Sequence, residues 1–125
     1  MSTHYDVLLL PGAGVNGFFT LGAIQCIYDM QKMGNIKKYI GTSIGSAICY
    51  LLILGLTPIE IMARIAREKP LTHFTKINLA SIIKGNGAFD WNHIDEFLLN
   101  VTLEKCEQPM SFKDIYNSYG VKLIC

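Results

Sequence analysis

A serine flanked by two glycines is the feature of the sequence that most directly suggests chemistry. Residues 41–45 read Gly41-Thr42-Ser43-Ile44-Gly45, a G-x-S-x-G pattern. In this pattern the serine occupies a sharp strand-to-helix turn that exposes its Oγ, and the glycines permit the strained backbone and the close packing of strand on helix. Ser43 is therefore a candidate nucleophile, and the backbone N–H of Ile44 can face a developing oxyanion. The alternative is that Ser43 is simply the N-cap of the apolar helix that follows.

A second glycine-rich segment follows an apolar run and precedes a helical pattern. It reads Gly12-Ala13-Gly14-Val15-Asn16-Gly17 and satisfies the dinucleotide fingerprint G-x-G-x-x-G. A dinucleotide site also needs an acidic residue at the end of the second strand, where this chain has Tyr39-Ile40-Gly41-Thr42. We therefore favour another use, in which backbone N–H groups of Gly12, Ala13 and Gly14 converge on an oxyanion. We expect no cofactor and no metal.

Hydrophobic periodicity predicts alternating strands and helices in the first half of the chain. The apolar run 5–10 is typical of a parallel strand covered on both faces. Helical spacing begins at Gly17 and is expected to stop at Gly34. A short strand at 38–40 precedes a helix, apolar on all sides and so buried, that runs to Leu54.

Capping signals mark the helices of the second half. Thr57 and Glu60 form a capping box around Pro58, Asn92 pairs with Asp95, and Ser111 pairs with Asp114. Residues 70–89 read as a long connection with one short helix, a candidate lid, and residues 121–124 read as a strand.

This alternation predicts the fold class, a three-layer α/β/α arrangement with a mostly parallel sheet. A chain of 125 residues has the size of a single domain. It stops inside or just after an apolar strand with no closing helix, so we expect residues 1–125 to be the N-terminal part of one domain of a longer protein.

The order of strand, glycine-rich turn, helix, strand, serine elbow and buried helix resembles the patatin-like phospholipases, most clearly over residues 5–68. The family's oxyanion segment, a run of glycines followed by a basic residue and a further glycine, corresponds to residues 12–17, and its nucleophile motif to residues 41–45. The resemblance implies a phospholipase A-type lipid acyl hydrolase that acts on phospholipids or neutral lipids. It assigns Ser43 as nucleophile. The positions implied for the oxyanion hole are Gly12, Ala13, Gly14 and Ile44, and the other motif positions are Asn16, Gly17, Gly41 and Gly45.

Three departures from the family pattern bear on catalysis. Asn16 stands where the family has a basic residue, and Ala13 replaces the middle glycine. The family pairs its serine with an aspartate in a later Asp-Gly-Gly or Asp-Gly-Ala motif, and this chain contains no Asp-Gly. The resemblance therefore implies an aspartate downstream of Cys125 and inactivity of the 125 residues alone. The alternative is a truncated or degenerate domain that serves as a non-catalytic structural component.

Other acidic and imidazole groups are weaker candidates for the base. Asp29, Asp95 and Asp114 fall at surface or capping positions of the predicted helices, which leaves Asp90 as the least implausible aspartate. Its spacing of three residues from His93 at a helix start favours mutual capping over a catalytic triad. We assign no histidine.

Composition and charge limit the partners. The formal net charge of +1 gives no electrostatic footprint for nucleic acid. The four cysteines, Cys26, Cys49, Cys106 and Cys125, are widely spaced and read as buried thiols of a reducing compartment. The N-terminus has no signal-peptide pattern, and the apolar run 44–56 is shorter than a bilayer span. We expect a cytoplasmic protein that is peripheral at membrane surfaces, and the sequence carries no signal for an oligomeric state.

Overall fold

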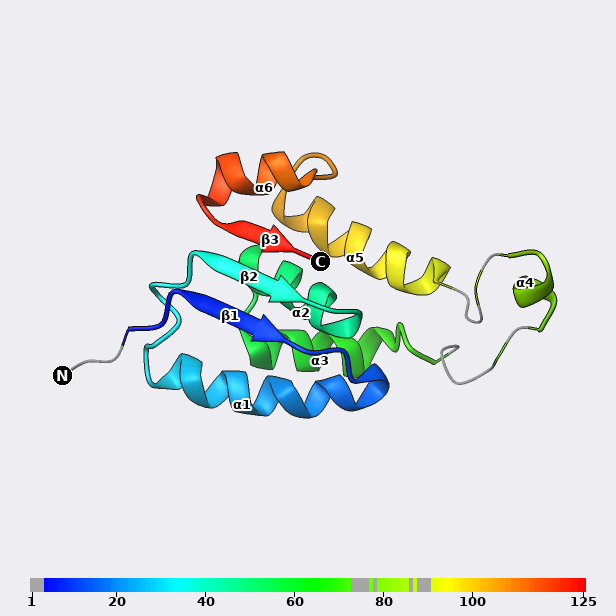
Figure 1. The fold of residues 1–125 in the computed structure, drawn as a ribbon, viewed down its shortest axis with the longest axis horizontal. Coiled ribbons are helices and arrows are strands. Elements are labelled where there is room, and N and C mark those ends of the chain that lie inside the picture. Colours follow the sequence, from blue (N-terminus) through cyan, green and yellow to red (C-terminus); the bar gives the residue numbers. More distant parts are fainter. Residues whose placement is uncertain (1–3, 73–76, 78, 86, 88–90) are drawn as a thin grey trace.

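The computed structural model describes residues 4–72, 77, 79–85, 87 and 91–125 of the chain (Figure 1). Its elements in chain order are β1 (Val7–Leu10), the 3-10 helix η1 (Gly14–Gly17), α1 (Phe18–Asp29), β2 (Lys38–Gly41), α2 (Ile44–Ile53), α3 (Pro58–Glu68), α4 (Leu79–Ile83), α5 (Asn92–Lys105), α6 (Phe112–Tyr119) and β3 (Lys122–Ile124).

The strands form one parallel sheet in the order β1-β2-β3 (Figure 1). In the register, Leu9 of β1 lies beside Ile40 of β2, which in turn lies beside Ile124 of β3. Parallel neighbours joined by helical crossovers define an α/β fold. The predicted fold class, an α/β fold with a parallel sheet, is confirmed.

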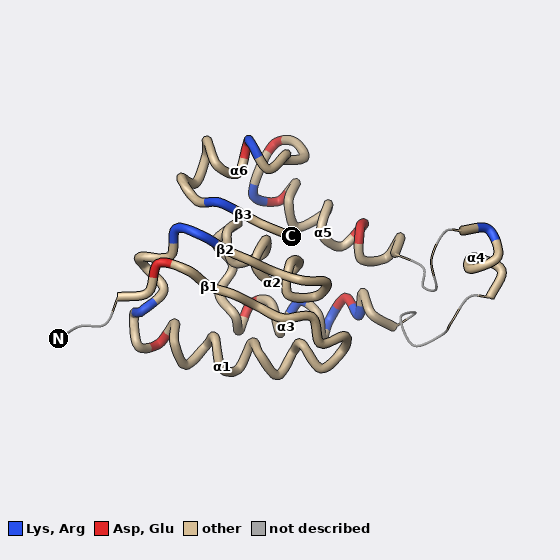
Figure 2. Tube along the Cα trace, viewed as in Figure 1, with Lys and Arg blue, Asp and Glu red and all other residues tan. Residues whose placement is uncertain are grey.

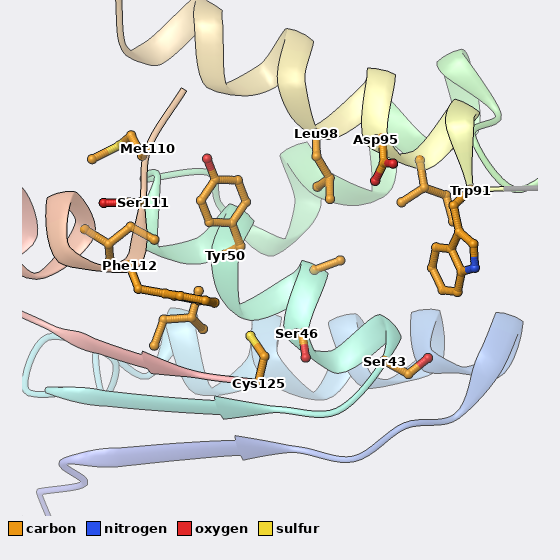
Figure 3. Close-up of a pocket in the computed structure, with 14 residues that line it drawn as sticks. Ser43, Ser46, Tyr50, Trp91, Asp95, Leu98, Met110, Ser111, Phe112 and Cys125 are labelled. Atoms are coloured by element: carbon orange, nitrogen blue, oxygen red, sulfur yellow. The ribbon is translucent and has the colours of Figure 1, made fainter. Parts of the chain in front are cut away.

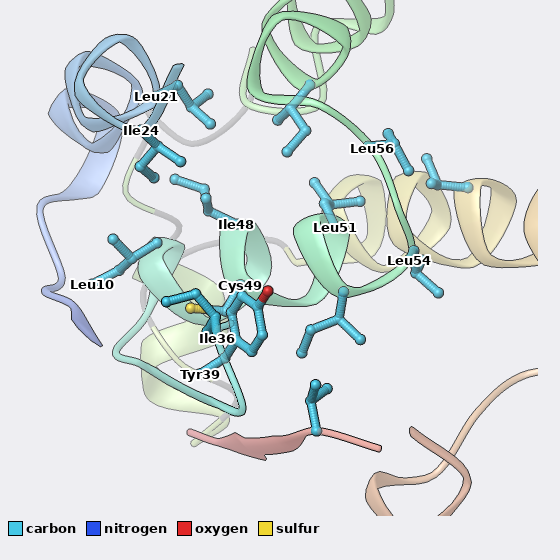
Figure 4. Close-up of a cluster of buried hydrophobic side chains, with 14 of the residues drawn as sticks. Leu10, Leu21, Ile24, Ile36, Tyr39, Ile48, Cys49, Leu51, Leu54 and Leu56 are labelled. Atoms are coloured by element: carbon cyan, nitrogen blue, oxygen red, sulfur yellow. The ribbon is translucent and has the colours of Figure 1, made fainter. Parts of the chain in front are cut away.

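The core lies between the sheet and the central helix α2. This helix packs against all three strands, while α1 packs on α3 and α6 on β3. Its all-round apolar sequence predicts central burial, and Ile48, Cys49 and Leu51 are indeed at most 2% exposed. Figure 4 shows α2 surrounded by side chains from β1, α1 and β2, among them Leu10, Leu21, Ile24 and Tyr39.

The opposite face of the sheet is uncovered in the part of the chain that the structure describes. Val7, Leu9 and Ile124 are 41%, 63% and 46% exposed, whereas Leu10 is buried. The prediction that the first strand is covered on both faces is therefore wrong for the described residues. A continuous apolar run carries no alternation that would show which face a layer covers. Two of the three predicted layers are present here, the sheet and the helices on one side of it.

Two of the predicted capping boxes are confirmed, those of Thr57 with Glu60 and of Ser111 with Asp114. The third prediction is wrong by one residue, since α5 starts at Asn92 with Trp91 at its N-cap.

The end of α1 also differs from the prediction. This helix stops at Asp29, before the predicted stop at Gly34, and Gln31 then adopts a φ of 57°.

Burial of the cysteines follows the prediction in part. Cys49 is buried and Cys106 is half-buried, but Cys26 and Cys125 are exposed, and all four thiols are free. Cys26 lies two residues after the buried Ile24, a spacing that points it to another side of α1.

Among the described residues no single helix is both long and apolar enough to cross a bilayer, and the pair α2 and α3, which passes by length and composition together, is bent by 120°.

Candidate active site

Ser43 occupies a strained turn between β2 and α2. Its φ of 54° and ψ of −125° lie in a region that residues with a side chain rarely adopt, at a cost of about 1–3 kcal/mol. It stands at the N-cap position of α2, yet its Oγ makes no capping hydrogen bond. The alternative role of a helix cap therefore does not account for this serine.

The glycines on either side of Ser43 are required by close backbone contacts. A Cβ on Gly41 would lie 2.5 Å from the Cα of Ser46, and a Cβ on Gly45 would lie 2.5 Å from the carbonyl oxygen of Leu10. Real Cβ atoms essentially never come this close to backbone atoms. The first turn of α2 is thus pressed against the ends of β1 and β2, as the G-x-S-x-G pattern suggests.

The glycine-rich segment packs directly against this turn. A Cβ on Gly12 would lie 3.4 Å from the Cβ of Ser43, and a Cβ on Gly17 would lie 2.5 Å from Cγ2 of Ile44. Gly14 has a φ of +53°, which glycine adopts without strain. The two motifs, distant in the sequence, are therefore neighbours in space at the carboxyl end of the sheet.

Backbone donors remain available beside the Ser43 side chain. Within the described residues, the N–H groups of Gly12, Ala13 and Gly14 donate to no backbone carbonyl. Ile44 is the first residue of α2, where a helix offers its N–H no acceptor, whereas Gly45 donates to the carbonyl of Thr42 at 2.9 Å. Four backbone N–H groups on the two motifs are thus candidate oxyanion donors.

Ser43 also lines one end of a cavity of about 440 Å³ between α2, α5, α6 and β3 (Figure 3). Pockets for small ligands fall in this size range. Most of its wall is apolar, and Asp95 is the charged side chain among the described residues that line it. The other lining residues are Ser46, Ala47, Tyr50, Trp91, Ile94, Leu98, Met110, Ser111, Phe112, Ile115, Leu123 and Cys125.

Among the described residues, Asp95 is the aspartate that lines this cavity. The sequence assigns it to a capping position, yet it lies on α5 above Ser43, on the same side of the helix as Leu98 (Figure 3). Asp29 instead accepts a hydrogen bond from Gln25 at 2.7 Å. Asp114 accepts from the backbone N–H and the Oγ of Ser111 at 2.8 and 2.7 Å.

Among the described residues, no histidine lines the cavity of Ser43. His93 lines a separate cavity with Glu68 and Asn100, to which Ser43 does not contribute. Asp90 and His73 lie outside the described residues. A Ser-His-Asp arrangement therefore has no counterpart in the part of the chain that the structure describes.

Neither Cys49 nor the end of β2 offers a second reactive or cofactor-binding site among the described residues. Burial raises the pKa of Cys49, a residue of α2, to about 12, so this thiol stays protonated at neutral pH. Its Sγ lies 3.8 Å from the carbonyl oxygen of Ile40. β2 ends at Gly41 with no acidic residue for a ribose hydroxyl. Across the described residues, His, Cys, Asp and Glu form no group of three that could hold a metal ion.

Sequence reasoning missed most of the cavity wall. Ser46, Ala47 and Tyr50 follow Ser43 at intervals of three, four and seven residues, the spacing of one helix face, so this part of the wall had a sequence signal. Met110 and Phe112 reach the cavity through tertiary packing, for which the sequence offers no local signal.

A parallel α/β sheet, a serine in a strained strand-to-helix turn and a glycine turn packed beside it define the arrangement in which serine hydrolases present a nucleophile.

Comparison with known proteins identifies the family. The family described as patatin-like phospholipase matches residues 8–111, so the chain belongs to this family. The chain is also similar to a protein of Invertebrate iridescent virus 6 named "Probable lipid hydrolase 463L". The two are 31% identical over 127 residues, which cover 97% of this chain and 42% of that protein. The chain thus spans about two fifths of the length of that relative. No solved structure matches the present chain.

Proposed function

We propose that the protein is a lipid acyl hydrolase of the phospholipase A type with Ser43 as its nucleophile. The observation that carries the proposal is the strained backbone conformation of Ser43. Its φ is 54°, and its side chain makes no capping hydrogen bond that would stabilise this conformation. Strain of this kind is concentrated at functional sites, where the surrounding structure maintains it. Here the glycine contacts with Leu10 and Ser46 maintain it.

The proposed reaction is a two-step acyl transfer through Ser43. Ser43 Oγ gives up its proton to a base and attacks the ester carbonyl, and the C–O bond to the alcohol breaks as the base returns the proton to that alcohol. The same base then takes a proton from water, which attacks the acyl-serine, and the fatty acid leaves as Ser43 Oγ regains its proton. N–H groups of Gly12, Ala13, Gly14 and Ile44 stabilise the oxyanion in both steps. Removal of a single such donor costs about 2.7–4 kcal/mol in other hydrolases, so the glycine turn matters together with the serine.

The general base in this proposal is an aspartate from outside these 125 residues. This chain contains no Asp-Gly, and the family pattern implies that motif for the base. Asn16 supplies an amide donor but no positive charge at the oxyanion segment. The 125 residues alone are therefore expected to turn over several orders of magnitude more slowly than the full-length protein.

The substrate would be the acyl ester of a phospholipid or neutral lipid, reached from a membrane surface by a peripheral, cytoplasmic protein. Residues 7–28, which lead into and along α1, contain no charged side chain (Figure 2). On this stretch Phe19 is 84% and Val15 48% exposed, and Val15 shares a small cavity with Ser43. An apolar rim beside the serine supports contact with a lipid surface.

A non-catalytic structural role is the second candidate. The absent Asp-Gly and the amide at Asn16 favour it. The strained serine favours the enzyme, as do the N–H groups of residues 12–14, which donate to no backbone carbonyl within the described residues.

Release of fatty acid from phospholipid vesicles by the full-length gene product decides between them. The enzyme predicts release that Ser43→Ala abolishes and that Ser46→Ala, one turn further along α2, retains. Equal release by the wild type and Ser43→Ala, or none by the wild type, would overturn the proposal.

A further inference from the structure

The side chains that α2 contributes to the cavity floor differ in size along the helix. Ser43, Ser46 and Ala47 are small, and Tyr50, on the same helix face, is large (Figure 3). A chain that leaves Ser43 along α2 therefore meets open space over one turn of helix and an aromatic ring at the next.

The ring of Tyr50 is held in place by a hydrogen bond from α2 to α5. Its hydroxyl lies 2.6 Å from Oγ1 of Thr102 on α5, and Thr102 Oγ1 donates to the carbonyl oxygen of Leu98 at 2.7 Å. Because the threonine proton is used in that bond, Tyr50 is the donor to Thr102. Thr102 is 3% exposed, so the pair is sheltered from water. Tyr50 thus connects the floor of the cavity on α2 to its roof on α5.

The distance from Ser43 to Tyr50 along α2 sets the length of acyl chain that fits straight between them. Seven residues of α-helix rise about 10 Å, which accommodates an extended acyl chain of about eight carbons from the serine. Past Tyr50, the cavity continues toward Met110 and Phe112 on the α6 side (Figure 3). A longer chain must bend around the tyrosine to enter that region.

We propose that Tyr50 is a specificity-determining residue that limits the straight path of a bound acyl chain to about eight carbons. The proposal rests on the proposed function for the identity of the ligand, an acyl group whose carbonyl lies at Ser43. The apolar wall, with Asp95 as its charged member among the described residues, suits an alkyl chain.

The test measures binding as a function of chain length in the full-length gene product. Saturated fatty acids of six to fourteen carbons are titrated against a fluorescent fatty acid, so that the head group stays constant. In the wild type, affinity should rise about fourfold for each methylene up to about eight carbons and then level off. In Tyr50→Ala the rise should continue to longer acids, and Tyr50→Phe, which keeps the ring, should level off near the wild-type length.

A reciprocal variant guards against misfolding of Tyr50→Ala. Ala47→Phe places a ring one turn closer to Ser43 and should shorten the limit to fewer carbons than in the wild type. Unchanged limits in both variants, or a wild-type affinity that keeps rising past ten carbons, would overturn the proposal.

Fluorophosphonate labelling of the same samples separates this inference from the proposed function. If Ser43 is not labelled but the affinities follow the predicted chain-length profile, hydrolysis is refuted and the role of Tyr50 in binding acyl chains stands. A labelled Ser43 with no length profile refutes the role of Tyr50 alone.

Discussion

Gly17 lies so close to Ile44 that a Cβ on the glycine would come within 2.5 Å of the isoleucine Cγ2. This contact joins the glycine-rich segment before α1 to the serine turn before α2. Because the N–H of Ile44 is a candidate oxyanion donor, the contact also positions that donor relative to Gly12 and Gly14. The close approach of the two motifs therefore requires a glycine at position 17, which has no side chain.

Gly17→Ala should lower the rate of fluorophosphonate labelling of Ser43 by about tenfold or more, because the new methyl group displaces Ile44 and its N–H. Gly22→Ala on α1, where no atom lies within 4 Å of the new Cβ, is the matched control and should stabilise the protein by up to about 1 kcal/mol. The double variant Gly17→Ala/Ile44→Ala should recover part of the rate. Equal rates for Gly17→Ala and the control would show that the contact does not position the donor.

Gly45→Ala should destabilise the fold by about 1–3 kcal/mol or more, because its Cβ would meet the carbonyl oxygen of Leu10 at 2.5 Å and that of Pro11 at 2.9 Å. Both atoms belong to the backbone and cannot rotate away. Urea unfolding measures the loss, with Gly34→Ala, which has open space around it, as the control. A Gly45→Ala variant as stable as the control would contradict the close packing of α2 on β1.

Asp95→Asn should leave hydrolysis within about threefold of the wild type, because the proposal takes the base from outside these residues. Initial rates on a short-chain ester are the measurement, with Ser43→Ala as the inactive reference. A loss comparable to that of Ser43→Ala would instead identify Asp95 as the base.

Features that depend on local sequence were predicted well. The capping boxes at Thr57 and Ser111 need only residues three positions apart, and both are present. The parallel α/β class also follows from the order of apolar runs and helical patterns.

Features that depend on tertiary packing were not predicted. The exposure of Leu9 arises from which layers cover the sheet, and the apolar run around it is compatible with either outcome. Asp95 has the spacing of a capping residue, but the packing of α5 over α2 places it in the cavity wall, which no local spacing predicts.

Acid should destabilise the wild type in part through Asp114. The hydroxyl of Ser111, and then its backbone N–H, donate to this carboxylate and lower its pKa. A lowered pKa gives stability that is present above the ordinary carboxyl range and is lost as the pH falls through the folded-state pKa. In thermal unfolding, Asp114→Asn should have a lower Tm than the wild type at pH 7, and the difference should shrink as the pH falls below the ordinary carboxyl range. A constant difference would contradict the role of the ionised carboxylate.

Phe19→Ser should weaken binding to phospholipid vesicles by about tenfold, because this ring is 84% exposed at the start of α1, four residues after Val15, which shares a small cavity with Ser43. Tyr28→Ser, at the other end of the same helix, is the matched control and should bind as the wild type does. Cosedimentation with vesicles measures both. Equal losses for the two variants would show that the rim at Phe19 is not the contact surface.

Covalent labelling of Ser43 tests the central claim most directly. The full-length gene product is treated with an alkyl fluorophosphonate, and intact mass and peptide mapping locate the adduct. We predict one adduct, on Ser43, that is retained in Ser46→Ala and lost in Ser43→Ala. Absence of an adduct from the folded wild type, or its persistence in Ser43→Ala, would contradict the assignment of Ser43 as the nucleophile.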